Sequence, residues 1–484
     1  MKTKTKIYLK RIPFPLLLLV LIMLTEHGAN AAIFIDDTVK SIKDTSVVKV
    51  KKDTTMTTLP PVKKRFWRAS GELMLAQIIP WSYNYFIRDA DFAHISFKSI
   101  GHNLKPSSWE WDDNNFTTNQ IGHPYQGSLY YSAFRSNGYS FWQAAPAAFA
   151  GSFMWEVAGE THNPAPNDFI NTSLGGIALG EMSYRVANRI INERQHGFKR
   201  QMSEVFGFLI NPMNGFNRII DGKWGRVSTA PETDLDTANL VAEIDLGARQ
   251  ISEKNQDLFE RGRIGWYARA RVLYGDPYRE SKTPFNNFDV TVELGKDDTA
   301  RLNTVRVNGL LSSWEIKSNM KVEHLLSLTM NYDFYHNQAF EYGAQSVNLT
   351  VYSEYDTNEK LKFFTRAGAG VVILAAVPDA YLYYGEGRNY DYGSGVSIIA
   401  NGGVSINNRW TGRLAYQGGW FETLNGSHSS YFLHAFAGEA RYRIFNRVSA
   451  GAEGGAFILH GYYRDYDDIN KKYPFIRLSI GVRI

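Results

Sequence analysis

The pattern of hydrophobic and polar positions changes once along the chain, near residues 221–236. Before this segment, apolar residues recur at spacings of three and four, which is typical of helices with one buried face. After it the spacing is two, which is typical of β-strands because successive side chains point to opposite faces. The pattern predicts a mostly helical domain over residues 66–222 and a β domain over residues 239–484.

The strand pattern is clearest at the end of the chain. Ile476, Leu478 and Ile480 fall on one face of a strand, and Arg477 and Ser479 fall on the other. Segments with this alternation number about twelve. We expect strands at 239–251, 260–275, 287–295, 300–314, 321–333, 345–355, 361–376, 394–406, 409–421, 430–444, 447–462 and 474–484.

Alternation alone also fits a soluble β-sandwich, so the links between strands decide the fold class. Short links such as Asn407-Asn408 and Phe445-Asn446 alternate with longer ones such as Pro378–Ser394 and Arg464–Lys472. An even strand number, turns on one side, loops on the other and apolar-out alternation are typical of outer-membrane barrels. The prediction is an α+β protein with an antiparallel transmembrane β-barrel of about twelve strands, in the outer membrane of a Gram-negative bacterium. The link Gly275–Asn286 is longer than this rule predicts.

The helical segment contains one stretch that is apolar on nearly all sides, at Phe141–Trp155, and such a helix should be buried. A further helix is expected at Phe198–Leu209. A barrel of about twelve strands is too narrow to hold such a domain. We therefore expect the helical domain to cover the periplasmic mouth or to pack beside the barrel, with at most one segment entering the lumen.

The N-terminus predicts export. A basic stretch from Lys2 to Arg11 precedes the apolar run Ile12–Leu24, and Ala29-Asn30-Ala31 forms a cleavage site, so residues 1–31 are expected to be a cleaved signal peptide. Residues 32–65 are rich in Lys, Thr, Val and Asp and are expected to form a flexible tether.

Charge and composition remove several classes of function. The formal net charge of +5 falls to +1 when the signal peptide leaves with five basic residues and one acidic residue, so nothing indicates a nucleic-acid partner. The sequence has no cysteine, which excludes disulfides and thiolate chemistry. The expected partner is the outer-membrane lipid bilayer, and the long loops are candidates for contacting an envelope lipid or another envelope protein.

The polar residues that are candidates for chemistry lie between residues 123 and 181. The candidate catalytic residues are His123, Glu156, Glu160 and Asp168, where His123 would act as a base beside a carboxylate. The accompanying motif residues are Tyr125, Gly127, Arg135, Asn171, Gly175, Gly176, Glu181 and Arg185. This set resembles an uncharacterised family of exported bacterial proteins defined only as a domain of unknown function, over about residues 100–195, and the resemblance implies no established catalytic residues.

Two interpretations of this region remain open. The first is an outer-membrane lipid hydrolase for acyl esters or phosphoesters, although G-x-S-x-G is absent and Ser128 and Ser132 come with no nucleophile elbow. The second is a buried polar network in which Glu156 and Glu160 pair with Arg135 and Arg185 to orient the helices. Because H-E-x-x-H is absent, no metal site and no cofactor are expected.

The barrel itself suggests a third function. Arg side chains expected in the lumen would line an anion pore, or would pair across it with carboxylates and close it. The arginines are Arg263, Arg269, Arg271, Arg413, Arg441, Arg443, Arg477 and Arg483, and the carboxylates are Glu243, Asp245, Glu439 and Glu453. Near balance of the charges favours the closed interior. The sequence therefore favours a non-catalytic envelope or narrow-channel protein with a helical domain at the periplasmic mouth, with the lipid hydrolase as the alternative.

Overall fold

The computed structural model describes residues 63–227, 238–252, 262–296, 301–317, 322–337, 341–358, 360–383, 385 and 387–484. The predicted signal peptide, and all of the predicted tether except residues 63–65, lie outside these ranges. Residues Lys63–Arg483 form one compact unit, so the helices and the barrel are parts of a single packed body.

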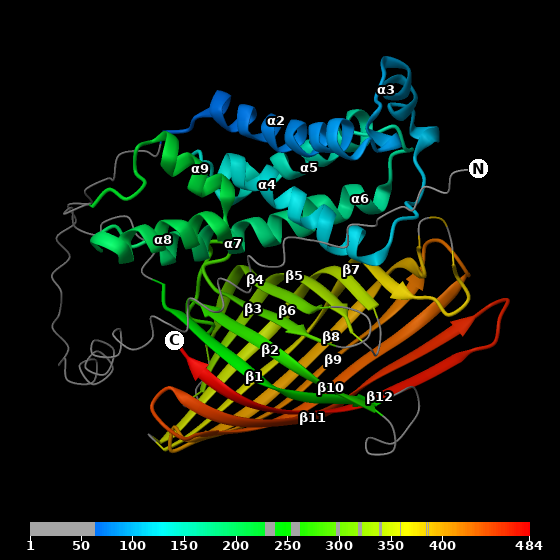
Figure 1. Ribbon diagram of the computed structural model, residues 1–484. Helices are drawn as coiled ribbons and strands as arrows, with labels where there is room; N and C mark the ends of the chain where they lie inside the picture. The colour runs from blue at the N-terminus through cyan, green and yellow to red at the C-terminus, as the bar shows by residue number, and fades with distance from the viewer. Residues whose placement is uncertain are drawn as a thin grey trace. The chain divides into compact units, whose positions relative to one another are not determined.

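The β domain is a closed antiparallel barrel of twelve strands in which β1 pairs with β12 (Figure 1). The strands are β1 (Leu240–Ser252), β2 (Gly262–Tyr274), β3 (Phe288–Gly295), β4 (Leu302–Ile316), β5 (Val322–His336), β6 (Glu341–Asn358), β7 (Leu361–Pro378), β8 (Tyr390–Ile406), β9 (Trp410–Thr423), β10 (Ser429–Arg443), β11 (Val448–Tyr463) and β12 (Ile469–Arg483). The predicted fold class and strand number are confirmed.

Two loops are shorter than the sequence indicated. β8 begins at Tyr390 instead of 394, and β12 begins at Ile469 instead of 474. The reason for the first is visible in the register, because Tyr390 pairs with Pro378 and Tyr392 with Ala376. Aromatic residues that looked like loop positions therefore extend the barrel wall.

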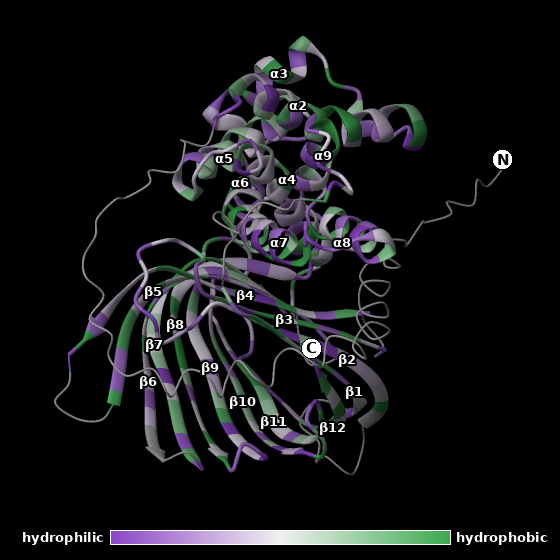
Figure 2. Cartoon of the chain, turned by 90° about the vertical axis from the view of Figure 1, so that its left-hand side faces the viewer, coloured by the Kyte–Doolittle hydropathy of each residue, from purple (hydrophilic) through white to green (hydrophobic). Residues whose placement is uncertain are grey.

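The two faces of the wall differ as the alternation predicted. On β12, Leu478 is 58% exposed on the outside, whereas Arg477 on the next position is buried inside. Figure 2 shows hydrophobic and hydrophilic residues interspersed along each strand. An apolar outer band with polar residues inside is the arrangement that a lipid-embedded barrel requires.

The helices precede the barrel in the chain. They are α2 (Phe66–Tyr83), η1 (Asn84–Arg88), η2 (Asp91–Ala93), α3 (Phe97–Asn103), η3 (Pro106–Ser108), η4 (Thr118–Gly122), α4 (His123–Arg135), α5 (Phe141–Ala158), α6 (Pro166–Ile170), η5 (Asn171–Gly175), α7 (Gly176–Ile190), α8 (Gly197–Ile210) and α9 (Pro212–Ile220). Among the described residues, no helix is both long and apolar enough to cross a membrane.

Helix α5 is only partly buried, contrary to expectation. Trp142 and Phe153 on one side are exposed by 61% and 44%, whereas Ala144 and Gly151 on the other side are buried. A Cβ at Gly151 would overlap the ring of Tyr130, so the small residues are the ones that face α4. Helix α5 therefore packs on α4 through its Ala and Gly residues, and Trp142 and Phe153 remain exposed.

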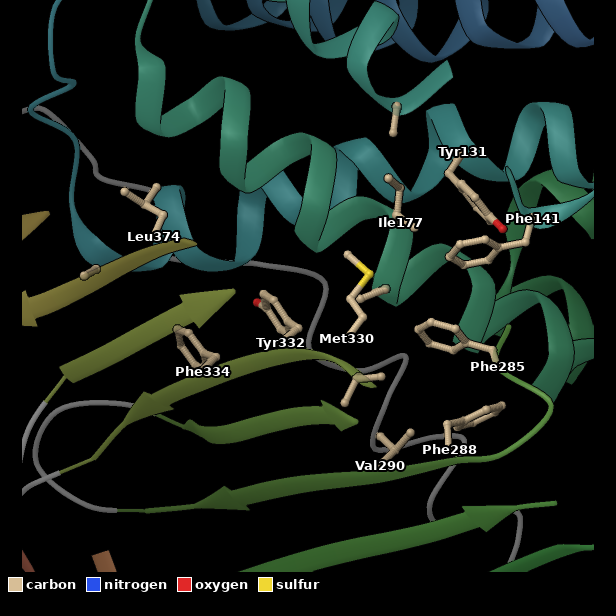
Figure 3. Packing of buried hydrophobic residues seen from close by; sticks show 14 of the residues in the cluster. Tyr131, Phe141, Ile177, Phe285, Phe288, Val290, Met330, Tyr332, Phe334 and Leu374 are labelled. Atoms are coloured by element: carbon tan, nitrogen blue, oxygen red, sulfur yellow. The ribbon is translucent and has the colours of Figure 1, made fainter. Parts of the chain in front are cut away.

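The helical domain packs on the outer wall of the barrel through one large hydrophobic cluster. Met330, Tyr332 and Phe334 project from β5 on the face opposite to the luminal Asp333. They belong to the same buried cluster as Tyr131 and Ile177 of the helices, as Figure 3 shows. The barrel wall here is covered by protein.

The contacts between helices and wall reach both ends of the strands. At one end Arg185 of α7 donates to the carbonyl oxygen of Pro284 in the β2–β3 link, and at the other Arg388 before β8 donates to the carbonyl oxygen of Asp112. Between them α7 contacts β4 and β5. Of the two predicted placements, packing beside the barrel is therefore the observed one, and the expectation of a domain confined to the periplasmic mouth is wrong. The lumen is lined by ion-paired and polar side chains of the barrel, so the apolar outer wall is the surface on which the helices bury their apolar residues.

Tyr332 provides a test of this interface. It is fully buried, and its hydroxyl donates to the carbonyl oxygen of Gln120. Replacing it with alanine leaves a cavity at the helix–barrel contact and should cost about 3–5 kcal/mol. We expect Tyr332→Ala to make the helical domain sensitive to limited proteolysis in detergent while the barrel keeps its heat-modifiable migration on gels.

The matched control is Leu414→Ala, which removes a side chain 73% exposed on the outside of β9 and should leave proteolysis unchanged. Equal protease resistance of Tyr332→Ala and Leu414→Ala would contradict the interface.

Candidate functional site

Three of the four candidate catalytic residues meet in space. His123 begins α4, Glu156 lies in the last turn of α5 and Asp168 lies in α6. One ligand-type atom from each lies within 4.8 Å of the others. The Nε2 atom of His123 is 3.6 Å from Oδ2 of Asp168, and the two side chains are 12% and 3% exposed. The three residues form a nearly buried His–carboxylate cluster.

Hydrogen bonds hold each member of the cluster in place. His123 Nδ1 is 3.2 Å from the hydroxyl oxygen of Thr172. Glu156 Oε2 accepts from the backbone N–H of Ala165 at 2.9 Å. Asp168 Oδ1 accepts from the amide of Asn167 at 2.7 Å.

Burial dominates the electrostatics of this cluster. It raises the pKa of Glu156 and of Asp168 well above the usual carboxyl values, and nearby carboxylates raise both further. Burial lowers the pKa of His123, although Asp112 opposes this effect. Glu160 is outside the three-residue cluster but near it, and burial together with Glu156 raises its pKa too. The site therefore holds several carboxyl groups that resist ionisation.

The predicted pairing of Glu156 and Glu160 with Arg135 and Arg185 is wrong. Both arginines bind Glu181 of α7 instead, Arg135 Nε at 2.7 Å and Arg185 Nε at 2.8 Å. The hydroxyl of Tyr131 donates to the same carboxylate at 2.7 Å. Arginine side chains on α4 and α7 reach Glu181 because these helices pack against each other, which spacing along the chain does not reveal. Glu181 and Arg185 lie four residues apart on α7, and both are buried.

The glycines of the motif allow α4 to pack closely on η5 and α7. A Cβ at Gly127 would overlap the carbonyl oxygen of Thr172, and a Cβ at Gly176 would overlap the backbone of Gly127. Gly175 lies against Pro124 and Tyr332 in the same way. This close crossing brings His123 beside α6 and η5. The glycines thus act on the site through helix packing.

The other two motif residues have different environments. Asn171 is fully buried and donates to the carbonyl oxygen of Asn119 at 3.2 Å. Tyr125 is 54% exposed, so it contributes little to the interior.

A layer of polar contacts joins the cluster to the barrel wall. The amide of Asn167 donates to the hydroxyl of Tyr392 at 2.9 Å, and the amide of Asn119 donates to the hydroxyls of Tyr390 and Tyr392 at 2.9 and 2.8 Å. Asn119 also donates to Asp112 at 2.7 Å. Spacing along the chain did not identify Asn119, Asn167, Tyr390 or Tyr392 as part of the site. The period-two spacing of Tyr390 and Tyr392 was a signal that they share a face, but nothing in it named their partners.

The geometry gives the lipid hydrolase alternative no support. The hydroxyl of Ser128 donates to the carbonyl oxygen of Tyr125, and that of Ser132 accepts from Asn211. Neither serine is therefore presented to His123 as a nucleophile. Among the described residues the hydroxyl bonded to His123 is that of Thr172, which also lies inside the helix packing.

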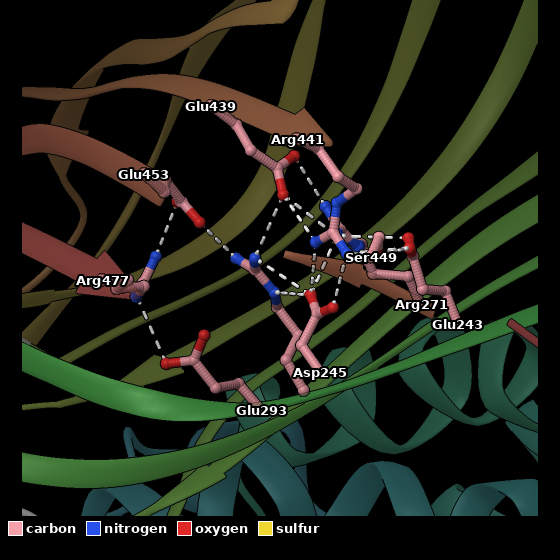
Figure 4. A network of polar contacts seen from close by, with 10 residues as sticks. Glu243, Asp245, Arg271, Glu293, Glu439, Arg441, Ser449, Glu453 and Arg477 are labelled. Atoms are coloured by element: carbon pink, nitrogen blue, oxygen red, sulfur yellow. Dashed lines mark hydrogen bonds and ion pairs between the residues drawn. The ribbon is translucent and has the colours of Figure 1, made fainter. Parts of the chain in front are cut away.

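The second candidate site is the lumen, where ion pairs cross between strands that are not neighbours (Figure 4). Arg271 of β2 binds Glu439 of β10 at 2.9 Å, and Arg441 binds Asp245 at 2.8 Å. Five arginines and five carboxylates form this network: Arg249, Arg269, Arg271, Arg441 and Arg477 with Glu243, Asp245, Glu293, Glu439 and Glu453. Arg249 and Glu293 were not among the predicted residues. The predicted cross-pairing is observed for Arg269, Arg271, Arg441 and Arg477. Arg413, Arg443 and Arg483 make no ion pair among the described residues, and the side chain of Arg263 lies outside them.

The rest of the lumen is only partly filled, because a space of about 550 Å³ is bordered by Arg366 and by small residues such as Ala415, Ala437 and Gly455. Arg366 of β7 reaches Asp289 of β3 at 3.1 Å, which is a second ion pair across the lumen. Tyr342, Phe421 and Tyr431 belong to a buried apolar cluster on the inner wall. Residues of both groups border a cavity of about 40 Å³. A space of this size has room for a few water molecules at most.

Two family models match parts of the chain. Residues 108–213 match the family model described as Domain of unknown function (DUF3943), and residues 284–432 match that of the OmpA-like transmembrane domain. No match was found among curated proteins.

Several solved outer-membrane barrels are similar over the barrel region. The outer membrane channel DcaP of Acinetobacter baumannii is 10% identical, with 51% of this chain and 97% of that chain covered and a TM-score of 0.26. The NanC porin is 14% identical, with 49% and 98% covered and a TM-score of 0.26. An outer membrane channel from Pseudomonas putida F1 is 10% identical, with 53% and 100% covered and a TM-score of 0.31. At these TM-scores the similarities carry no weight for function.

Glu181 is the most exacting test of the helical packing. Glu181→Ala removes the carboxylate that accepts from the buried Arg185, the partly buried Arg135 and the hydroxyl of Tyr131. Removing one partner from a buried ion pair costs about 3–5 kcal/mol. We expect a corresponding loss in thermal stability of the helical circular-dichroism signal, with a smaller loss for Glu181→Gln.

The control is Glu110→Gln, which changes an exposed carboxylate of the same domain. A Glu181→Ala protein as stable as this control would show that the pairing contributes nothing.

Proposed function

We propose that this outer-membrane β-barrel, with its domain of unknown function packed on the outer wall, is a narrow and normally closed channel that catalyses no reaction. In this proposal the predicted signal peptide, residues 1–31, directs export, and the bilayer surrounds the part of the wall that the helices leave uncovered.

The observation that carries the proposal is the network of ion pairs that crosses the lumen. In the network of ten residues, a nitrogen of every arginine lies within 3.2 Å of a carboxylate oxygen. The network contains as many arginines as carboxylates. An ion entering this region would have to displace an existing partner from a buried arginine or carboxylate. Such displacement is expensive in a region of low dielectric constant.

The position of the ion pairs suggests that they can open and close the lumen. The Arg271–Glu439 pair links β2 to β10, which are separated in the barrel by β1, β12 and β11. The backbone pairing of neighbouring strands does not depend on a contact of this kind. Side chains that close the lumen in this way can separate while the strands stay paired.

The double variant Arg271→Gln with Glu439→Gln tests this function. It removes one pair across the lumen and keeps the numbers of luminal positive and negative charges equal. We expect more frequent and larger conductance steps than the wild type in planar lipid bilayers, because water and ions can enter where the pair was. Heat-modifiable migration would show that the barrel remains folded.

The matched control is Arg464→Gln with Asp465→Asn, which removes two opposite charges from an exposed link. It should conduct like the wild type. If both double variants are as silent as the wild type, the barrel is a structural scaffold and the channel proposal is overturned.

A further inference from the structure

The cluster of His123, Glu156 and Asp168 has a composition that the packing of the helices does not explain. One imidazole nitrogen and two carboxylate oxygens approach one another from three different helices, within 4.8 Å. Two buried carboxylates placed this close repel each other when ionised. A fold that needed only a polar contact here could use an amide in place of either one.

The carboxyl groups of this cluster also lack the arginine partners that other buried carboxylates of the same domain have. Glu181 has Arg135 and Arg185, and Glu204 has Arg200 and Arg218. For Glu156, Glu160 and Asp168, the structure as described offers no lysine or arginine within ion-pair distance, and His123 faces Asp168 alone. Buried charges are normally paired or coordinate a metal.

The hydrogen bonds around the cluster leave one atom of each residue available. His123 uses Nδ1 toward Thr172, which leaves Nε2 on the side of Asp168. Asp168 uses Oδ1 toward Asn167, which leaves Oδ2. Glu156 uses Oε2 toward Ala165, which leaves Oε1. A second hydrogen bond that fixes the free end of a ligand is a regular feature of metal-binding histidines and carboxylates.

A chain of hydrogen bonds through Asn167 links the cluster to two buried asparagines whose amide oxygens have no donor among the described residues. Oδ1 of Asn119 and Oδ1 of Asn171 are fully buried and accept no hydrogen bond in the described structure. Asn171 is bonded to Asn119, and Asn119 reaches Asn167 through the hydroxyl of Tyr392. Buried acceptors without a donor are rare, and a water molecule held by an ion would supply one.

We infer that His123, Glu156 and Asp168 bind one divalent transition-metal ion of the zinc or manganese class. Mixed imidazole and carboxylate ligands favour this class over calcium and magnesium, which take oxygen ligands. Ligands at about 2.1 Å from a tetrahedral ion are roughly 3.4 Å apart, close to the 3.6 Å between His123 and Asp168. Glu156, whose ligand atom lies within 4.8 Å of the other two, would move closer on binding, and three protein ligands leave a position for water.

The consequence of binding would be mechanical. The ion ties α4, α5 and α6 together at one point, and Asn167 connects that point to Tyr392 of the barrel wall. The absence of H-E-x-x-H says nothing against this site, since its ligands come from three separate helices. The inference is independent of the channel function, because the site lies outside the lumen.

The test is Zn²⁺ binding to the full chain in detergent after chelation. We expect one Zn²⁺ per chain by calorimetry, and a rise in the melting temperature of the helical signal. Asp168→Asn keeps the size of the side chain, and His123→Ala removes the nitrogen ligand. Each should weaken Zn²⁺ binding at least about tenfold and abolish the rise in melting temperature. A folded circular-dichroism spectrum of Asp168→Asn separates loss of the site from loss of the fold.

His102→Ala is the matched control, because His102 is an exposed histidine of the same domain that contacts Asn163. It should bind Zn²⁺ as the wild type does. Mn²⁺ and Ca²⁺ are titrated in parallel. Binding of Ca²⁺ alone, no stoichiometric binding of Zn²⁺ or Mn²⁺, or binding that persists in both Asp168→Asn and His123→Ala would overturn the inference.

Discussion

The polar groups on the outside of the barrel wall impose the constraint on which the arrangement of this protein depends. Tyr332, Tyr390 and Tyr392 point away from the lumen, yet their hydroxyls need hydrogen-bond partners that lipid chains do not offer. Gln120, Asn119 and Asn167 of the helical domain supply them. A wall built in this way is complete only when the helices cover it, so the helical domain is part of the barrel's outer surface.

Buried polar groups between the helices also need hydrogen-bond partners, and they find them on neighbouring helices. Glu181 accepts from Arg135, Arg185 and Tyr131, which come from both helices that pack at that point. Gly127 and Gly176 make the crossing close enough for these side chains to reach one another. Small residues set the distance between α4 and α7, and the carboxylate sets their orientation.

Buried polar groups in the lumen also need partners, and there the partners are charged side chains. A barrel of twelve strands has enough space for a channel, but here arginines and carboxylates from six strands pair inside it. The cluster at His123 differs, because its carboxylates meet one another and a single histidine. The contrast between the ion-paired network in the lumen and the unpaired carboxylates of the cluster is what separates a structural network from a candidate binding site.

The sequence by itself determined the features that depend on local direction. Alternation at period two placed Leu478 outside and Arg477 inside, and it located the strands of the barrel to within a few residues, except where Tyr390 and Ile469 begin strands earlier than expected. It also indicated that Arg271 and Glu439 would both face the lumen. These results follow from strand geometry, in which the face of a side chain depends only on its position along the strand.

Only the tertiary structure decided which of these groups meet. Glu156 is closer to Arg135 along the chain than Glu181 is, but because α4 packs on α7 both Arg135 and Arg185 bind Glu181. The convergence of His123 with Asp168 likewise depends on how three helices pack, and so does the choice of the outer wall over the mouth as the docking surface. Spacing along a chain reports the direction of a side chain, whereas its partner depends on the distances between elements, which are set by the packing of the whole molecule.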